Sequence, residues 1–191
     1  MVKGPMTAPL RPLEIYDTTL RDGAQAEDVS FSADDKVRIA QKLDELGVQF
    51  IEGGWPGANP KDIEFFRIIK TIPLQHATVV AFGATRRAGN PVHKDANIQA
   101  LVAADTSTVT LFGKSWNLHV TEALNVSLSK NLELIEDSVA YLREKGRRLF
   151  YDAEHFFDGY KADPDYALET IRRAVKGGAE RVILCDTNGG A

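Results

Sequence analysis

The sequence predicts an α/β protein built as a TIM (β/α)8 barrel, of which about six βα units are present. Short apolar runs alternate with amphipathic stretches along the 191 residues, the pattern of a parallel sheet with crossover helices. No run is followed by the glycine-rich fingerprint of a dinucleotide-binding fold, and polar residues follow nearly every run. Because these barrels place their active sites at the carboxyl ends of their strands, the polar residues favour a barrel over an open doubly wound sheet.

The individual elements follow from local signals. Six apolar runs have the length of buried strands, and they cover residues 13–16, 49–53, 77–82, 107–112, 148–153 and 181–186. Ser32 and the pairs Asn59–Pro60 and Asp163–Pro164 are typical first residues of helices. Gly47 and Gly146 are expected to end two of these helices, the second of which spans residues 130–145 with apolar side chains three and four positions apart.

The length sets an expectation for domain organisation. A complete barrel has eight βα units and typically about 250 residues. We therefore expect residues 13–191 to be a partial catalytic barrel, without strands seven and eight and without a regulatory domain. Residues 1–12 contain prolines and no apolar core of a secretory signal, so we expect them to form a disordered lead-in.

The composition narrows the class of partner. The chain is 43% hydrophobic and 26% charged, as in ordinary globular proteins, and its single cysteine fits a reducing compartment, which predicts a cytoplasmic protein. The net charge is −4 with acids and bases interspersed, so nucleic acid is not an expected partner. No apolar run reaches the roughly 18 residues of a membrane span, so no membrane association is expected. A small-molecule substrate is the partner that the composition favours.

The first apolar run leads into the segment DTTLRDGAQ, residues 17–25. At the end of a strand, the guanidinium of Arg21 is a permanent cation that can stabilise a developing oxyanion. The neighbouring carboxylate of Asp22 suits a hard divalent metal ion. The same tripeptide is also typical of a solvated surface turn, so this segment alone leaves both interpretations open.

The second run ends in Glu52, followed by the glycine-rich segment GGWPGANP. Glycines beside an acidic residue indicate a backbone that passes close to a ligand or to a neighbouring strand end, although a plain βα loop has a similar composition. Trp55 in this loop either walls a pocket or packs at the edge of the core.

Polar residues also mark the ends of the fifth and sixth runs. Asp152 and Glu154 share one face of the predicted strand, which in a barrel is the interior, where a carboxylate needs a cation, a metal ion or a hydrogen-bonding substrate. Glu154 lies nearer the end of the strand and is the better functional candidate. After the sixth run, the hydroxyl of Thr187 can donate to a substrate carboxylate, whereas Cys185 is more simply a small core residue than a nucleophile.

In their order and placement, five motifs closely resemble those of the family of isopropylmalate, homocitrate and citramalate synthases, which shares a barrel with hydroxymethylglutaryl-CoA lyase. The motifs are DTTLRDGAQ, IEGGWPGANPKD, LFGKSW, YDAEHFFDGY and LCDTNGG, and the resemblance runs from about Leu13 to Gly190. Within the family, the segments GGWPGANPKDIEFF and FDGYKADPDYAL look most like those of the citramalate synthases.

The resemblance implies an acyltransferase that condenses acetyl-CoA with pyruvate to give citramalate and CoA, at the first step of a pyruvate route to isoleucine. It also implies a divalent metal ion (Mg, Mn or Zn) that polarises the ketone. The expected partners are the small molecules pyruvate and acetyl-CoA, and the expected assembly is a homodimer.

Carried over residue by residue, the resemblance implies a role for each motif residue. Asp22 would bind the metal ion, and Arg21 would contact the keto acid and stabilise negative charge. Glu154 would line the metal and keto-acid pocket as a catalytic residue, and Thr187 would bind the carboxylate of the keto acid. Two further family positions receive a supporting role in substrate binding, Gln25 and Glu52.

The sequence departs from the family pattern in one respect. Family members place two metal-binding histidines, separated by one residue, at the end of strand seven, and the 191 residues contain no such pair. We therefore expect the parent protein to be the enzyme and this chain on its own to be inactive. Three alternatives stay open: a 2-isopropylmalate or homocitrate synthase that uses a larger keto acid, a hydroxymethylglutaryl-CoA lyase-type C–C lyase, and a non-catalytic partial barrel that binds partners through open strand edges.

Overall fold

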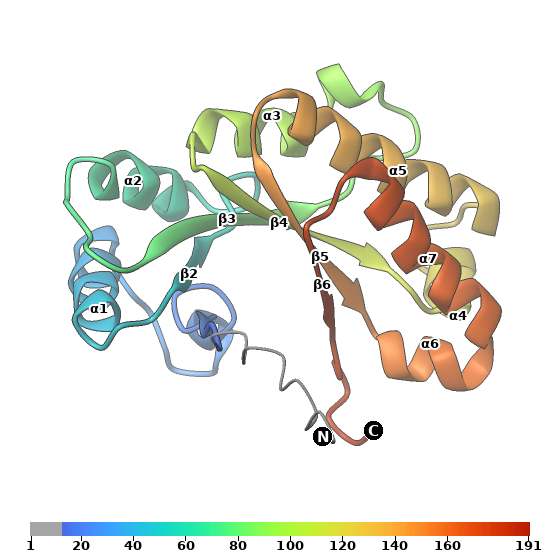
Figure 1. Ribbon diagram of the computed structural model, residues 1–191, viewed down its shortest axis with the longest axis horizontal. Coiled ribbons are helices and arrows are strands. Elements are labelled where there is room, and N and C mark those ends of the chain that lie inside the picture. Colours follow the sequence, from blue (N-terminus) through green and yellow to red (C-terminus); the bar gives the residue numbers. More distant parts are fainter. Residues whose placement is uncertain (1–12) are drawn as a thin grey trace, which may run out of the picture.

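Six parallel strands form a single sheet in the computed structural model, which describes residues 13–191. Their order is β1-β2-β3-β4-β5-β6, so each strand lies beside its neighbour in sequence. Figure 1 shows the helices in an arc around the strands, with α1 and α2 on the left, α3 and α5 above, and α6 and α7 on the right. The predicted α/β fold with six βα units of a barrel is confirmed, as a half-barrel.

The strand bounds differ from the expected ones mainly at the two edges of the sheet. The strands are β1 (Tyr16–Asp17), β2 (Phe50–Gly54), β3 (Thr78–Ala84), β4 (Thr108–Lys114), β5 (Arg148–Glu154) and β6 (Arg181–Leu184). The first begins later than expected and the last ends earlier, because each of these two strands pairs with only one neighbour. Cys185 and Asp186 therefore belong to the loop after β6.

Three of the seven α-helices in residues 13–191 begin directly after the predicted caps Ser32, Asn59 and Asp163, and the helix expected from residue 130 begins at Leu128. The helices are α1 (Ala33–Glu45), α2 (Pro60–Ile69), α3 (Ala96–Ala104), α4 (Asn117–Glu122), α5 (Leu128–Glu144), α6 (Phe156–Ala162) and α7 (Pro164–Gly177). Ser32 caps α1 by accepting from the N–H of Asp35, whose side chain accepts in return from the N–H of Ser32. Asn59 and Asp163 cap α2 and α7 through side-chain oxygens that accept from a backbone N–H group. Within residues 13–191, no helix is long and apolar enough to cross a membrane.

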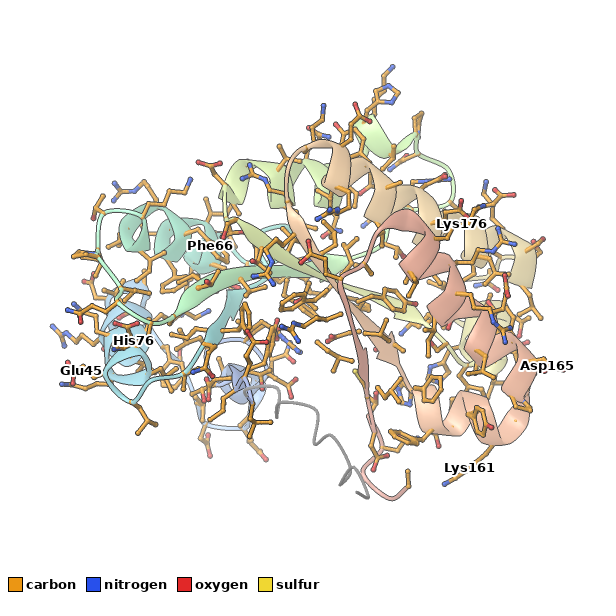
Figure 2. The ribbon with its side chains drawn as sticks, in the orientation of Figure 1. Glu45, Phe66, His76, Lys161, Asp165 and Lys176 are labelled. Carbon is orange, nitrogen blue, oxygen red and sulfur yellow. The ribbon has the colours of Figure 1, made fainter. Side chains whose placement is uncertain are left out.

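The main core lies between the sheet and the helices. Its largest fully buried members include Phe65, Ile98, Leu101 and Leu142 from the helices and Leu111 from β4. In Figure 2, Phe66 lies between α2 and the sheet, whereas Lys161 and Lys176 extend away from the sheet. A smaller apolar cluster on the inner side of the strands contains Phe50 and Phe150. The core thus fixes the strands from outside and leaves their carboxyl ends free for polar side chains.

The glycine-rich segment after β2 approaches helices of the chain itself. A Cβ atom on Gly53 would collide with the Phe65 ring of α2. Gly54 has a φ of 147°, and a Cβ atom there would collide with the carboxylate of Asp62. These glycines therefore let α2 pack closely against the end of β2, which accounts for a backbone that passes near another group without invoking a ligand.

Candidate active site

A cavity of about 500 Å³ lies at the carboxyl ends of the strands. All six strands contribute to it, either directly or through the loop that follows. Its lining residues are Arg21, Asp22 and Gln25 after β1, Trp55 after β2, Phe82 of β3, Phe112 of β4, Asp152 and Glu154 of β5, and Cys185, Asp186 and Thr187 after β6. Of the predicted site residues, the structure brings Arg21, Asp22, Gln25, Glu154 and Thr187 together in this cavity, and it places Glu52 beneath Arg21.

Arg21 is held in place from three directions. Its Nε donates to Oε1 of Glu52 at 2.5 Å, and its Nη1 donates to Oδ1 of Asp22 at 2.9 Å. Its guanidinium carbon lies 3.9 Å from the centroid of the Phe82 ring. The backbone turn that carries Arg21 is closed by the carbonyl of Thr18, which accepts from three successive N–H groups. The cation is thus oriented before any substrate arrives, which is the arrangement that stabilises a developing oxyanion.

Glu52 supports Arg21 from below. Its side chain is fully buried, and its Oε2 accepts from the hydroxyl of Tyr16 at 2.5 Å, while that hydroxyl lies 2.7 Å from Oγ1 of Thr110. Burial raises the pKa of Glu52, and the Arg21 cation opposes this rise. Both carboxylate oxygens are engaged within the protein, so the geometry gives Glu52 a positioning role through Arg21.

The two carboxyl groups of β5 have different environments. Oε2 of Glu154 lies 2.5 Å from Nζ of Lys114, the residue paired with it on β4. Asp152 is only 8% exposed, and its Oδ1 is buried without a hydrogen-bond partner in residues 13–191. Burial, followed by the charge of Glu52, raises the pKa of Asp152 to about 7. The sequence analysis placed both residues on this face and chose Glu154 because it lies nearer the end of the strand. Strand position does not show that Glu154 meets a cation and that Asp152 does not.

The loop after β6 presents a hydroxyl and a neutral thiol. Oγ1 of Thr187 accepts from the N–H of His155 at 2.9 Å, which leaves its hydroxyl hydrogen free for a ligand acceptor. The carboxylate of Asp186 accepts from the N–H groups of Gly190 and Ala191 and so shapes the loop. Burial raises the pKa of Cys185 to about 12, so its thiol stays protonated at neutral pH and is not an activated nucleophile.

Three aromatic rings form the apolar wall of the cavity. Phe82 and Phe112 stack with their centroids 5.2 Å apart, and Trp55 stands edge-on to both at 6.0 and 5.3 Å. The indole N–H of Trp55 donates to Asn97, which fixes the ring. Trp55 therefore walls the pocket, one of the two interpretations left open above. Sequence reasoning missed Phe82 and Phe112, because an apolar residue at a strand end has the same pattern whether it faces a pocket or the core.

The donors for a metal ion are incomplete in this part of the chain. Asp22 is the predicted ligand, and its side chain is 63% exposed at the cavity. No three His, Cys, Asp or Glu side chains among residues 13–191 gather as a metal centre. Since a divalent ion normally takes several protein ligands, these residues do not hold it by themselves. The role of Asp22 as a metal ligand stays a prediction.

Two histidines lie beside the cavity rather than in its lining. The rings of His119 and His155 meet with centroids 4.4 Å apart, and Trp116 packs against both. Nδ1 of His155 lies 3.2 Å from the carboxylate of Asp158. Burial lowers the pKa of His119. His119 and His155 are therefore packed among aromatic rings.

Comparisons with known proteins identify the relatives of this half-barrel. Residues 12–191 match the model of the HMGL-like family. The chain is 57% identical over 178 residues to an (R)-citramalate synthase of Geobacter sulfurreducens, a match that covers 93% of this chain and 34% of that protein. It is 34% identical over 177 residues to a probable 2-isopropylmalate synthase of Methanopyrus kandleri, covering 93% of this chain and 33% of that protein.

The solved structures agree on the fold. Hydroxymethylglutaryl-CoA lyase from Pseudomonas aeruginosa superposes with a TM-score of 0.72 at 22% identity, over 93% of this chain and 59% of that one. This chain spans about a third of the length of the curated relatives that it matches. The family match extends over nearly the whole sequence, and the half-barrel shares the fold of the lyase structure. The chain belongs to the HMGL-like family.

Proposed function

We propose that the protein is an acyltransferase that condenses acetyl-CoA with pyruvate to give citramalate and CoA. One observation carries the proposal: Arg21, Glu154 and Thr187, the positions that the resemblance assigns to the keto acid, line a single cavity. The identity to a citramalate synthase, 57%, well exceeds the 34% identity to a 2-isopropylmalate synthase, which favours pyruvate over a larger keto acid. In this proposal the product enters isoleucine biosynthesis in the cytoplasm.

The proposed condensation needs a group that stabilises the alkoxide formed from the ketone oxygen of pyruvate. A base takes a proton from the methyl carbon of acetyl-CoA, and the resulting carbanion forms a carbon–carbon bond to the ketone carbon of pyruvate. The π electrons of the ketone move onto its oxygen, and this alkoxide then takes up a proton to give the hydroxyl group of citramalate. Water then cleaves the thioester and releases CoA. Arg21, held by Glu52 and by the Phe82 ring, donates to the oxygen that gains charge. The free hydroxyl hydrogen of Thr187 is donated to the carboxylate of the keto acid.

Two features of the cavity are compatible with pyruvate, the paired charges of Lys114 and Glu154 and the apolar wall. Lys114 neutralises Glu154, so this pair adds little net charge to repel an anion. The rings of Trp55, Phe82 and Phe112 supply an apolar surface for the methyl group of pyruvate. The resemblance also implies a divalent metal ion beside Asp22. Because residues 13–191 lack the other ligands, we derive no step through it.

The test uses the full-length chain as its gene encodes it. We expect CoA release that depends on pyruvate, detected with a thiol reagent, and citramalate as the product in mass spectrometry. Arg21→Met is expected to lower kcat by about 100-fold or more, whereas Asp165→Asn, at an exposed position of α7, should leave kcat unchanged.

Two other outcomes would overturn the proposal. A higher kcat/KM with a larger keto acid than with pyruvate would indicate the isopropylmalate or homocitrate synthase reaction. Cleavage of hydroxymethylglutaryl-CoA without any condensation would indicate the lyase. One methylene is worth only about 1–3 kcal/mol in such a pocket, so both keto acids must be measured over full saturation curves.

A further inference from the structure

The charges in and beneath the cavity do not balance in pairs. Two cations, Arg21 and Lys114, face five carboxyl groups, which are those of Asp22, Glu52, Asp152, Glu154 and Asp186. Arg21 binds the carboxylates of Asp22 and Glu52, and Lys114 binds that of Glu154. Among residues 13–191, Asp152 and Asp186 form no ion pair, and Asp186 accepts from the N–H groups of Gly190 and Ala191 instead. Asp152 is therefore the member of this set with neither a cation nor a hydrogen-bond donor at its Oδ1.

The surroundings of Asp152 disfavour a negative charge. In the sheet it pairs with Phe112 of β4 on one side and with Ile183 of β6 on the other. Asp152 is only 8% exposed, and its Oδ1 accepts no hydrogen bond from the described residues. A buried carboxylate without a cation or a donor is costly, and the group takes up a proton instead.

The titratable groups around Asp152 act mainly in the same direction. They are Tyr16 of β1, Arg21 and Asp22 after β1, Glu52 of β2, Glu154 of β5 and Cys185 after β6. Burial raises the pKa of Asp152 most, the carboxylates add to the rise, and Arg21 opposes it. The result, a pKa of about 7, agrees with the geometry.

We propose that Asp152 meets the substrate as a neutral carboxylic acid and donates its O–H to an anionic oxygen of the bound 2-oxo acid. An ionised Asp152 would repel a substrate carboxylate, whereas a protonated one adds a second donor, beside Thr187, to the lining of the cavity. A buried carboxyl group that stays neutral can supply a hydrogen bond to developing or resident negative charge. This inference rests on the proposed function, because it names a further group that recognises the keto acid.

Substitutions at Asp152 separate donation from charge. Asp152→Ala removes the donor, and KM for pyruvate is expected to rise about 10- to 100-fold, the cost of a hydrogen bond to a charged group. Asp152→Asn keeps an N–H donor of similar size, so its KM should lie at least about tenfold below that of Asp152→Ala. Equal KM values for the two variants would overturn the inference, and Asp165→Asn is the matched surface control.

Proton uptake gives a readout that a purely structural role would not change. Above its pKa, Asp152 must bind a proton before it can donate, so KM of the wild type should rise between pH 6 and pH 9, and that of Asp152→Asn should rise less. Calorimetric titration of the full-length chain with pyruvate at pH 8, in buffers of different ionisation enthalpy, should show uptake of about one proton, absent in Asp152→Asn.

The two proposals fail separately. If the wild type forms no citramalate, the proposed condensation is wrong, yet the calorimetric titration still decides the role of Asp152. Pyruvate binding without proton uptake would overturn the role of Asp152 and leave the condensation standing. Absence of any pyruvate binding would overturn both.

Discussion

Arg21 is held by two carboxylates of very different exposure, and the difference predicts how the site fails. Asp22 is 63% exposed, whereas Glu52 is fully buried. Removing the cation would strand the buried charge of Glu52. Of the two ion pairs, only the loss of the buried Arg21–Glu52 pair should therefore lower the free energy of unfolding.

We predict that Arg21→Met lowers the free energy of unfolding by about 3–5 kcal/mol, because one partner of a buried ion pair is left alone. The double variant Arg21→Met/Glu52→Gln should recover most of this loss, since it leaves no buried charge, but it should recover no condensation activity. Urea denaturation of the full-length variants measures the first effect and CoA release the second. Stability that stays low in the double variant would show that Arg21 supports the fold by other contacts.

At this scale the sequence predicts the types of residue better than their partners. Arg21, Asp22 and Thr187 could be named because the segments around them carry a recognisable motif. That Glu154 meets Lys114 depends on the register of β4 against β5, which no local pattern encodes. The same pairing leaves Asp152 without a cation, which the sequence alone does not show.

Gly54 shows the same kind of dependence within an element. Its φ of 147° is strained for any other residue, and a Cβ atom there would meet Asp62. Asp62 in turn forms a buried ion pair with Lys36 and accepts from the N–H of Trp55 at 2.8 Å. The glycine thus couples the end of β2 to α1, α2 and the Trp55 wall of the cavity.

We expect Gly54→Ala to lower the free energy of unfolding by about 2–4 kcal/mol, the sum of backbone strain and displacement of a buried carboxylate. Gly89→Ala is the matched control, because a Cβ atom there has no neighbour within 4 Å, and it should change stability by no more than about 0.5 kcal/mol. Chemical denaturation compares the two. Equal free energies of unfolding for the two variants would mean that the backbone at the end of β2 shifts to accept a Cβ atom without loss of stability.

Asp44 near the end of α1 organises the connection between α2 and β3. Its carboxylate accepts from the N–H groups of Gln75, His76 and Ala77 at 2.7–2.8 Å. Burial works against ionisation, but these three donors outweigh it and lower the pKa of Asp44. The ionised side chain is therefore part of the folded loop.

Asp44→Ala should lower the free energy of unfolding by about 1–3 kcal/mol at pH 7, because backbone donors lose their acceptor. Since the folded pKa is depressed, the contribution of the charge is complete above the unfolded value of about 3.9 and disappears as the pH falls through the folded pKa. The difference between wild type and variant should consequently narrow at acid pH. Denaturation curves at pH 7 and pH 3 that show the same difference would contradict this account.

Helix starts were predictable where a capping side chain stands beside the helix that it caps. The capping side chains accept from N–H groups only two or three residues away, so the local sequence predicts these helix starts. The capping residues are Ser32, Asn59 and Asp163. The ends of β1 and β6 were not predictable from local signals, since a strand extends only as far as its neighbour pairs with it. Local signals therefore set the helices, and distant pairing sets the strands.

For the molecule as a whole, strand order follows from the alternation of strands and helices. Successive βαβ units place each new strand beside the last one, and the six strands together form half of a barrel. Within the described residues, β1 and β6 are the edges, and Ile15 and Leu184 near them are about half exposed. The alternative of a binding module depends on these edges pairing with another chain. A single monomeric species of the 191-residue chain in sedimentation would count against it.

The 191 residues taken alone should not catalyse the proposed condensation. Asp22 is the one predicted metal ligand, and residues 13–191 contain no cluster of three side chains that could hold the ion. We predict that this chain, supplied with Mg²⁺ or Mn²⁺, releases no CoA in response to pyruvate, whereas the full-length chain turns over at about 1 per second or faster. Circular dichroism must show that the short chain is folded, so that inactivity reports the missing ligands. Turnover of the folded short chain at the full-length rate would show that the half-barrel needs no further ligands, and that Arg21 and the cavity around it suffice.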